Sequence, residues 1–324
     1  METVGHKLQK EFLKKSQQLG KIPNAFLFVG KEGIGKKLLA LEFAKGLLCQ
    51  KFEPFGCNGC KSCRQINSFI EALKKGEEDK FFYYARGDDG KKHFAYLIGD
   101  HPDLAVVIPD GNQIKIDQIR ELQEFVALKP TGKFKVIIID QAGKMNPQAQ
   151  NALLKTLEEP PPGTLFILIS TTKGELLPTI VSRCQVLEFK PLKPQEVREV
   201  LKRLNRDIPK EVENLILEEG SFDLLKVENE NLFTILSRLS KYSNLTFEEI
   251  VKLAEEIEKF DTEEKELFLK LIEEELTKKV VNGEFPLEVF ERVKPLLEDM
   301  KVGLKRGLKF KLAVENLLFT LKGF

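Results

Sequence analysis

The hydrophobic pattern divides the chain at about residue 190. Before this point, short runs of apolar residues alternate with longer stretches in which apolar residues recur every three or four positions. The short runs are typical of buried strands and the longer stretches predict amphipathic helices. Their alternation predicts an α/β domain with a parallel sheet. The runs predicted as strands are 26–29, 104–108, 135–140, 165–170 and 185–189.

Two helices are predicted with particular clarity in this first part, over 116–127 and 147–158. The second has Asn146 in a position to cap its first turn and Pro147 at its first helical position, where a missing N–H costs nothing. It must end before the prolines at 160–162, which cannot continue a helix.

Strand signals disappear after the helix-breaking sequence at 191–194. We therefore expect three domains: an α/β domain over 1–190, a small helical lid domain over 191–240 and an all-α collar domain over 241–324. Helical spacing of apolar residues predicts the helices of the last two. They are expected at 195–204, 210–219, 229–239, 246–259, 262–280, 287–299 and 303–322.

A glycine-rich loop joins the strand at 26–29 to the helix predicted from residue 38. Glycines let backbone N–H groups turn towards phosphate oxygens, and the following helix N-terminus adds positive potential. This context is typical of a P-loop of Walker A type and predicts a site for ATP or ADP. The alternative is a glycine-rich turn without a ligand. The residues that would form the site are Gly30, Gly33, Gly35 and Lys36.

Two positions that a hydrolysing site needs carry unusual residues. The residue after the loop lysine should be Ser or Thr, because its hydroxyl binds Mg²⁺, but here it is Lys37, a cation without an acceptor atom. Asp140 ends the strand at 135–140, as a magnesium-binding aspartate should, yet Gln141 stands where many ATPases have a glutamate base. We expect a degenerate site that lacks a magnesium ligand at Lys37 and does not hydrolyse ATP.

Four of the five cysteines lie close together in the sequence, with glycines between them that allow tight turns. Four thiolates at such spacing can surround Zn²⁺ tetrahedrally, and a site filled by four protein ligands is structural. A redox pair or partial disulfide bonding are the alternatives. Cys184 stands apart and is not expected to be a ligand. The predicted ligands are Cys49, Cys57, Cys60 and Cys63.

Composition and charge narrow the class of protein. The 324 residues are 42% hydrophobic, which suffices for ordinary cores. The 51 basic and 50 acidic residues leave a net charge of +1, which argues against a protein that simply coats nucleic acid. The high density of charged residues of both signs resembles that of thermophile protein surfaces. No apolar run reaches the ~18 residues of a membrane span, and no signal-peptide core is present. We expect a cytoplasmic protein without membrane contact.

The insertion at about 67–98 has two interpretations. It combines consecutive aromatic residues with Arg86 and a glycine-flanked segment at 87–90. Aromatic and basic side chains together could stack on nucleic-acid bases. The alternative, which the turn at 87–90 favours, is a hairpin or helix that packs against the zinc module.

In sequence order, these motifs resemble the clamp-loader branch of the AAA+ ATPases, over essentially the whole chain. Within it, Lys37 and Gln141 match the delta prime subunits of bacterial DNA polymerase III, whereas the gamma/tau ATPases would have Thr and Glu there. Further matching segments are 101–103 (His-Pro-Asp), 151–160, 182–184 (Ser-Arg-Cys) and the collar helix at 307–315.

The resemblance implies a non-hydrolysing subunit of a pentameric clamp loader within the DNA polymerase holoenzyme. Its partners would be gamma/tau and delta subunits and, through them, the sliding clamp and primer-template DNA. The resemblance also implies that Arg183 points across a subunit interface at a neighbour's ATP, as an arginine finger. Two other functions remain open: an active gamma/tau-like ATPase, and a zinc module that binds nucleic acid and carries a vestigial P-loop.

Overall fold

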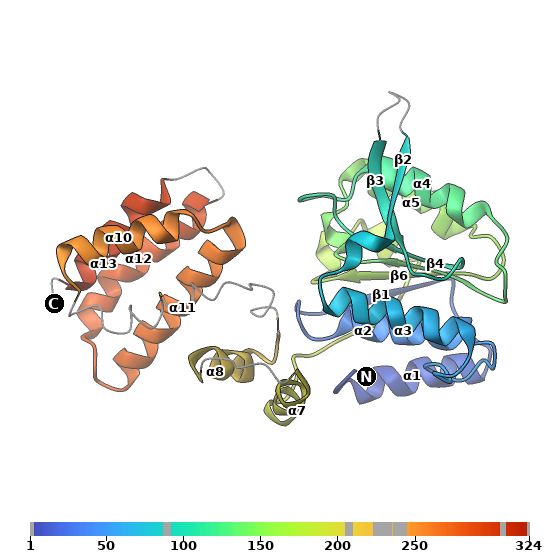
Figure 1. Cartoon of the computed structure of the whole chain (residues 1–324), viewed down its shortest axis with the longest axis horizontal. Helices are drawn as coiled ribbons and strands as arrows, with labels where there is room; N and C mark the ends of the chain where they lie inside the picture. Colours follow the sequence, from blue (N-terminus) through green and yellow to red (C-terminus); the bar gives the residue numbers. More distant parts are fainter. Residues whose placement is uncertain are drawn as a thin grey trace. The chain divides into compact units, whose positions relative to one another are not determined.

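The computed structural model describes residues 3–86, 92–204, 210–222, 235, 245–304 and 309–322. The chain forms two compact units, Met1–Asp223 and Leu224–Phe324 (Figure 1). The first contains the sheet and the second, in its described part, consists of helices. The predicted domain limits at 190 and 240 stay predictions.

A seven-stranded sheet in the order β2-β3-β4-β5-β6-β1-β7 forms the centre of the first unit. The five strands predicted from apolar runs are confirmed as β1, β4, β5, β6 and β7, and these pair in parallel. β2 and β3 form an antiparallel hairpin that extends one edge, so the sheet is mixed and not wholly parallel. The strands are β1 Ala25–Val29, β2 Phe82–Arg86, β3 Lys92–Ile98, β4 Leu104–Val107, β5 Lys135–Ile139, β6 Thr164–Ser170 and β7 Gln185–Glu188.

Helices cover both faces of the sheet because successive strand side chains point to opposite sides. Phe26 and Phe28 pack with α1, α2 and α3 on one face, whereas Ala25 and Leu27 belong to the core under α4, α5 and α6 on the other (Figure 1). The chain therefore builds a three-layer α/β/α unit. The helices are α1 Lys7–Gln18, α2 Lys36–Leu48, α3 Lys61–Lys74, α4 Ile116–Ala127, α5 Pro147–Glu158 and α6 Pro178–Val181.

The limits predicted for α4 and α5 are confirmed. The Asn146 side chain accepts a hydrogen bond of 2.8 Å from the Ala149 N–H, as predicted for the cap of α5. Three single-turn 3₁₀ helices and two further α-helices complete the unit. These are η1 Glu78–Phe81, η2 Ala142–Lys144, η3 Lys173–Glu175, α7 Pro194–Leu204 and α8 Lys210–Glu219.

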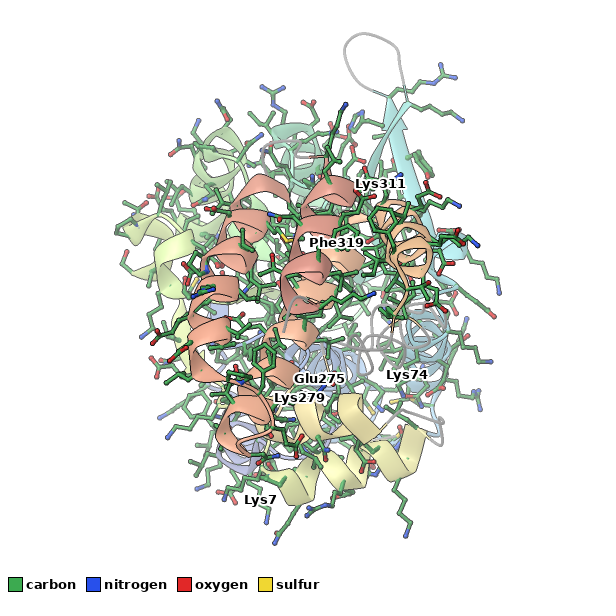
Figure 2. The ribbon with its side chains drawn as sticks, turned by 90° about the vertical axis from the view of Figure 1, so that its left-hand side faces the viewer. Lys7, Lys74, Glu275, Lys279, Lys311 and Phe319 are labelled. Carbon is green, nitrogen blue, oxygen red and sulfur yellow. The ribbon has the colours of Figure 1, made fainter. Side chains whose placement is uncertain are left out.

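In its described part, the second unit consists of helices that pack around Phe268 and Phe310, whose rings meet edge to face at 6.3 Å. Charged pairs lie on its outer surface, among them Glu275 and Lys279, one turn apart on α11 with 3.3 Å between their charged groups (Figure 2). Its helices are α10 Phe247–Glu258, α11 Thr262–Val281, α12 Leu287–Leu304 and α13 Phe310–Lys322.

Two helix predictions for this region need comment. The helix expected over 303–322 is wrong at its start, because residues 303–304 complete α12 and α13 begins at Phe310. Apolar spacing continues across both helices, so periodicity alone could not separate them. The helix expected at 229–239 lies, apart from residue 235, outside the described residues. None of the helices in the described ranges is long and apolar enough to cross a membrane.

Candidate functional site: a P-loop, a paired arginine and a four-cysteine cluster

The P-loop connects β1 to α2 at the carboxyl end of the parallel strands, which is where ligands bind in such sheets. Gly33 and Gly35 have φ of 70° and 96°, a region that favours glycine. A Cβ at Gly30 would collide with the carbonyl oxygen of Phe189. These glycines are therefore required by the backbone path of the loop itself.

Lys36, the predicted phosphate ligand, turns into its own loop. Its side chain is buried, and its ammonium donates hydrogen bonds to the carbonyl oxygens of Gly30 and, at 2.5 Å, Lys31. A bound phosphate would have to draw the ammonium away from these oxygens. The loop thus has an internal cation that satisfies its carbonyl groups.

Lys37 forms an ion pair with Asp140. Lys37 stands where a hydrolysing site has a Ser or Thr, and Asp140 is the aspartate expected to bind magnesium in such a site. The Lys37 Nζ lies 3.2 Å from Asp140 Oδ2, and the two side chains are 35% and 14% exposed. The other carboxylate oxygen of Asp140 accepts a hydrogen bond of 3.1 Å from the Gln141 N–H. An ammonium therefore occupies the side of the carboxylate on which a hydrolysing site would hold a divalent cation.

Gln141 follows β5 in a left-handed conformation, with φ of 51°. Its side-chain oxygen is buried and accepts no hydrogen bond within the described parts of the chain. An amide cannot take a proton from water near neutral pH. The position that could activate a water molecule is thus chemically inert.

The segment that follows α8 reaches the P-loop, a contact that the sequence did not suggest. Ser221 Oγ donates to the Glu32 carbonyl at 2.6 Å, and the Phe222 N–H donates to the Gly33 carbonyl at 2.9 Å. Glu219 pairs with Lys31 at 2.6 Å. No motif marks these residues, because their role depends on tertiary placement alone.

The N-terminal segment also contacts the loop and the helix behind it. The His6 imidazole Nε2 lies 2.6 Å from the carbonyl oxygen of Ile34, and the Thr3 N–H donates to the Glu42 carboxylate at 2.9 Å. Burial lowers the pKa of His6, since its charged form would lose hydration. Sequence reasoning missed this contact.

Arg183 lies between α6 and β7 and is held by Glu158 at the end of α5. Its Nη2 lies 2.6 Å from Glu158 Oε1, and its Nη1 donates to the Thr179 carbonyl at 2.8 Å. The side chain is 34% exposed. The structure thereby joins two motifs that are far apart in the sequence: the acidic end of α5 and the Ser-Arg-Cys segment. Cys184 is a separate, half-buried thiol, and burial raises its pKa to about 12.

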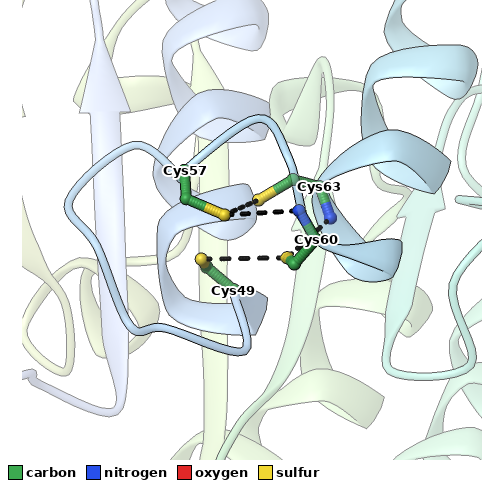
Figure 3. A group of neighbouring side chains, drawn as sticks. All are labelled: Cys49, Cys57, Cys60 and Cys63. Atoms are coloured by element: carbon green, nitrogen blue, oxygen red, sulfur yellow. Dashed lines mark hydrogen bonds between the residues drawn. The ribbon is translucent and has the colours of Figure 1, made fainter.

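The four predicted cysteine ligands converge at the start of α3 (Figure 3). All four Sγ atoms lie within 4.8 Å of one another, with 3.9 Å between Cys49 and Cys60 and 4.0 Å between Cys57 and Cys63. A tetrahedral zinc site with Zn–S bonds of about 2.3 Å requires S–S separations of roughly 3.8 Å. The cluster could therefore hold a zinc ion. The five cysteines are free thiols, so disulfide bonding is not what holds it together.

Backbone hydrogen bonds favour thiolates in this cluster. The Cys60 N–H points at Cys57 Sγ and the Cys63 N–H at Cys60 Sγ, both at 3.4 Å. Burial alone would raise the pKa of Cys60, but hydrogen bonds from Cys63 and Gln50 outweigh it and hold that pKa at about 6. A thiol that ionises this easily suits a metal ligand.

The loop carrying the cluster is tied to the domain at two points. Lys45 on α2 donates to the side-chain oxygens of Asn58 and Asn67, at 2.8 and 2.9 Å. The His101 ring lies 3.1 Å from Ser62 Oγ and accepts a hydrogen bond from the Asp103 N–H. His101 thus links the turn before β4 to α3.

Comparison with known proteins identifies the family to which the chain belongs. The family model described as "DNA polymerase III, delta subunit" matches residues 5–72 and 92–193. The DNA polymerase III subunit delta' of Bacillus subtilis is 35% identical over 192 residues, which are 59% of this chain and 49% of that protein. The delta' subunit of Pseudomonas aeruginosa is 36% identical over 165 residues, or 50% of this chain and 41% of the relative. The chain thus spans less than half the length of these relatives.

More distant similarity extends further along the chain. The DNA polymerase III subunit tau of Bacillus subtilis is 31% identical over 228 residues, or 69% of this chain and 33% of tau. A solved DNA polymerase III gamma subunit-related protein from Thermotoga maritima covers 97% of this chain and 99% of its own, with a TM-score of 0.50 and 21% identity, a likeness of fold alone. Because the family model matches over half of the residues, the chain belongs to the DNA polymerase III delta subunit family, with delta' proteins among its relatives.

Proposed function

We propose that the chain is a delta prime-type, non-hydrolysing subunit of a DNA polymerase III clamp loader. The observation that carries the proposal is the ion pair between Lys37 and Asp140. It supplies positive charge where an active subunit would hold Mg²⁺, so a metal ion would have to displace the Lys37 ammonium from the carboxylate. Together with the amide of Gln141, this supports a P-loop domain that cannot run the hydrolytic step.

In this proposal Arg183 contributes to catalysis in a neighbouring gamma/tau-like subunit, where its guanidinium contacts the bound ATP. A planar guanidinium spreads positive charge over the γ-phosphate oxygens and stabilises the transition state. The ion pair with Glu158 supports this role, because it fixes the orientation of a partly exposed arginine without enclosing it. Glu158 would be a positioning residue and would not touch the nucleotide.

The remaining parts have proposed structural roles. Zn²⁺ bound by the four cysteines would fix the loop between α2 and α3. The helices at 191–240 would form the lid, and those at 241–324 would join a collar with gamma/tau and delta subunits. Through that complex the chain would help to load the sliding clamp onto primer-template DNA. An occupied nucleotide site would require ATP or ADP to compete with the internal contacts of Lys36.

Two alternatives follow from the same residues. An active gamma/tau-like ATPase would hydrolyse ATP alone, which the Lys37–Asp140 pair opposes. A zinc-dependent nucleic-acid-binding module with a vestigial P-loop would act without partners, and the net charge of +1 opposes general coating of nucleic acid.

The test is reconstitution with gamma/tau and delta subunits, followed by DNA-stimulated ATP hydrolysis. The complex containing Arg183→Ala should assemble normally and hydrolyse ATP more slowly, while the isolated chain should show negligible hydrolysis in either form. Arg120→Ala is the matched control, because Arg120 is an exposed arginine paired with Asp117 on α4. Equal rates for the Arg183→Ala and wild-type complexes would remove the arginine from the mechanism. Hydrolysis by the isolated chain that is lost on removal of Lys36 would favour the active ATPase.

A further inference from the structure

The hairpin of β2 and β3 lies partly outside the residues that the family model matches. The family model passes over residues 73–91, which contain η1 and β2. The hairpin forms the edge of the sheet opposite β7 and projects beyond the layers of helices (Figure 1). Its five aromatic residues and basic residues have no role in the function proposed above.

The two faces of the hairpin differ in what covers them. On one face, Tyr83 stacks on Tyr96 at 5.0 Å, and Tyr96 contacts Phe125 of α4 at 5.6 Å. Burial, followed by the neighbouring Tyr83 and two acidic residues of α4, raises the pKa of Tyr96 to about 12. This face is therefore packed against a helix and lies near negative charge, which disfavours an anionic ligand.

The opposite face, here called the aromatic–basic face, consists of Phe82, Tyr84, Arg86, Lys92 and Phe94. The register pairs Tyr84 with Phe94 and Arg86 with Lys92, so the five side chains follow one another outward. Phe82 and Phe94 are in contact at 4.9 Å and rest on the core. Tyr84 is 52% exposed, with 6.0 Å between its ring and that of Phe94.

The outer end of this face carries two like charges in direct opposition. Arg86 and Lys92 are cross-strand partners, both are exposed, and neither forms an ion pair with any residue in the described ranges. Like charges directly opposite each other destabilise a sheet. Among the described residues of the hairpin, their opposition is thus unfavourable, and it becomes favourable when an anion lies between them.

We propose that the aromatic–basic face binds single-stranded DNA. A base stacks on the exposed ring of Tyr84, and the adjacent phosphates lie against Arg86 and Lys92. A single strand fits better than a duplex, because the bases of a duplex are stacked on each other and cannot reach the tyrosine ring. The choice of DNA over RNA rests on the proposed function in replication.

The experiment measures binding of a fluorescently labelled oligothymidylate to the full chain by anisotropy. Tyr84→Ala should weaken binding about tenfold, as expected for loss of one stacked base, whereas Tyr84→Phe keeps the ring and should bind like the wild type. The double variant Arg86→Gln/Lys92→Gln should reduce the slope of log K against log salt by roughly 1.4, at about 0.7 per phosphate contact on single strands. Arg120→Gln on the far side of the hairpin should leave the slope unchanged.

Three results would overturn the proposal. They are the absence of wild-type binding, equal binding by Tyr84→Ala, and equal competition by a duplex of the same length. If Tyr84→Ala instead weakens association with gamma/tau or delta subunits and leaves DNA binding unchanged, the face docks a protein. Normal assembly of the clamp loader without DNA binding by this chain would refute the inference and leave the proposed function standing. Failure of assembly with DNA binding retained would refute only the function.

Discussion

Removing the positive charge of Lys37 should destabilise the first unit, because Asp140 loses its partner. The informative change is Lys37→Met, which keeps the aliphatic length. At 3.2 Å and an effective dielectric constant of about 20, two unit charges attract by roughly 5 kcal/mol, an upper bound. The lysine side chain is 35% exposed and loses rotamer freedom in the pair, so we expect a net loss of about 1 kcal/mol.

A loss of that size is measurable by calorimetry of the full chain. For a unit of roughly 200 residues, 1 kcal/mol corresponds to a decrease of about 2–4 °C in Tm. Lys144→Met is the matched control, because Lys144 is exposed and lies near the same end of β5. It should leave Tm unchanged.

The second variant, Lys37→Thr, tests whether the Lys37 ammonium excludes Mg²⁺ from Asp140. A threonine hydroxyl beside the Asp140 carboxylate offers oxygen ligands that suit Mg²⁺. Mg²⁺ with ADP should therefore raise the Tm of Lys37→Thr, while the Tm of the wild type with ADP should be the same with or without added Mg²⁺. The reasoning fails if Lys37→Met melts like the wild type. It fails equally if Mg²⁺ stabilises the wild type as much as Lys37→Thr.

Four further outcomes are expected. The purified chain should contain about one zinc per molecule by elemental analysis, and Cys60→Ser should lose the metal and melt several degrees lower. Burial lowers the pKa of His6, so the unfolded chain binds its proton more readily and stability should fall as the pH drops below about 6.5. Urea titrations should show a smaller loss between neutral and acidic pH for His6→Asn, which tolerates the left-handed backbone at this position. Glu158→Gln should slow ATP hydrolysis by the reconstituted complex less than Arg183→Ala does, and should leave assembly unchanged by gel filtration. A chain that ends at Asp223 should retain the circular dichroism of an α/β protein and fail to join gamma/tau and delta subunits, whereas normal assembly would contradict the collar role.

Buried regular structure was predictable because its signal is local. Four of the five parallel strands, β1, β4, β5 and β6, are largely continuous apolar runs, which is what a strand covered on both faces requires. The limits of α5 follow from an asparagine cap and a proline stop, both encoded within a few residues. The cysteine cluster was predictable for the same reason, since its ligands lie within one short segment.

The pairing of charged residues was not predictable, because it depends on which loops meet in space. Lys37 and Asp140 are separated by about one hundred positions, and nothing in either motif specifies that they form an ion pair. The family resemblance implies that Arg183 acts as an arginine finger. The structure shows that it forms a salt bridge with Glu158, and a role in trans stays a prediction.

The P-loop of this chain is stabilised by contacts with other groups of the protein. Lys36 satisfies carbonyl oxygens of the loop, Lys37 neutralises Asp140, and Ser221 and Phe222 hold the loop from the side of α8. A loop with internal partners does not need a ligand to keep its shape, since its polar groups are already paired. A subunit built this way would keep one conformation while its neighbours bind and hydrolyse ATP. We infer that the proposed loss of hydrolysis and the internal pairing of the P-loop are linked, because Lys37 stands in the place of a metal ligand and neutralises Asp140.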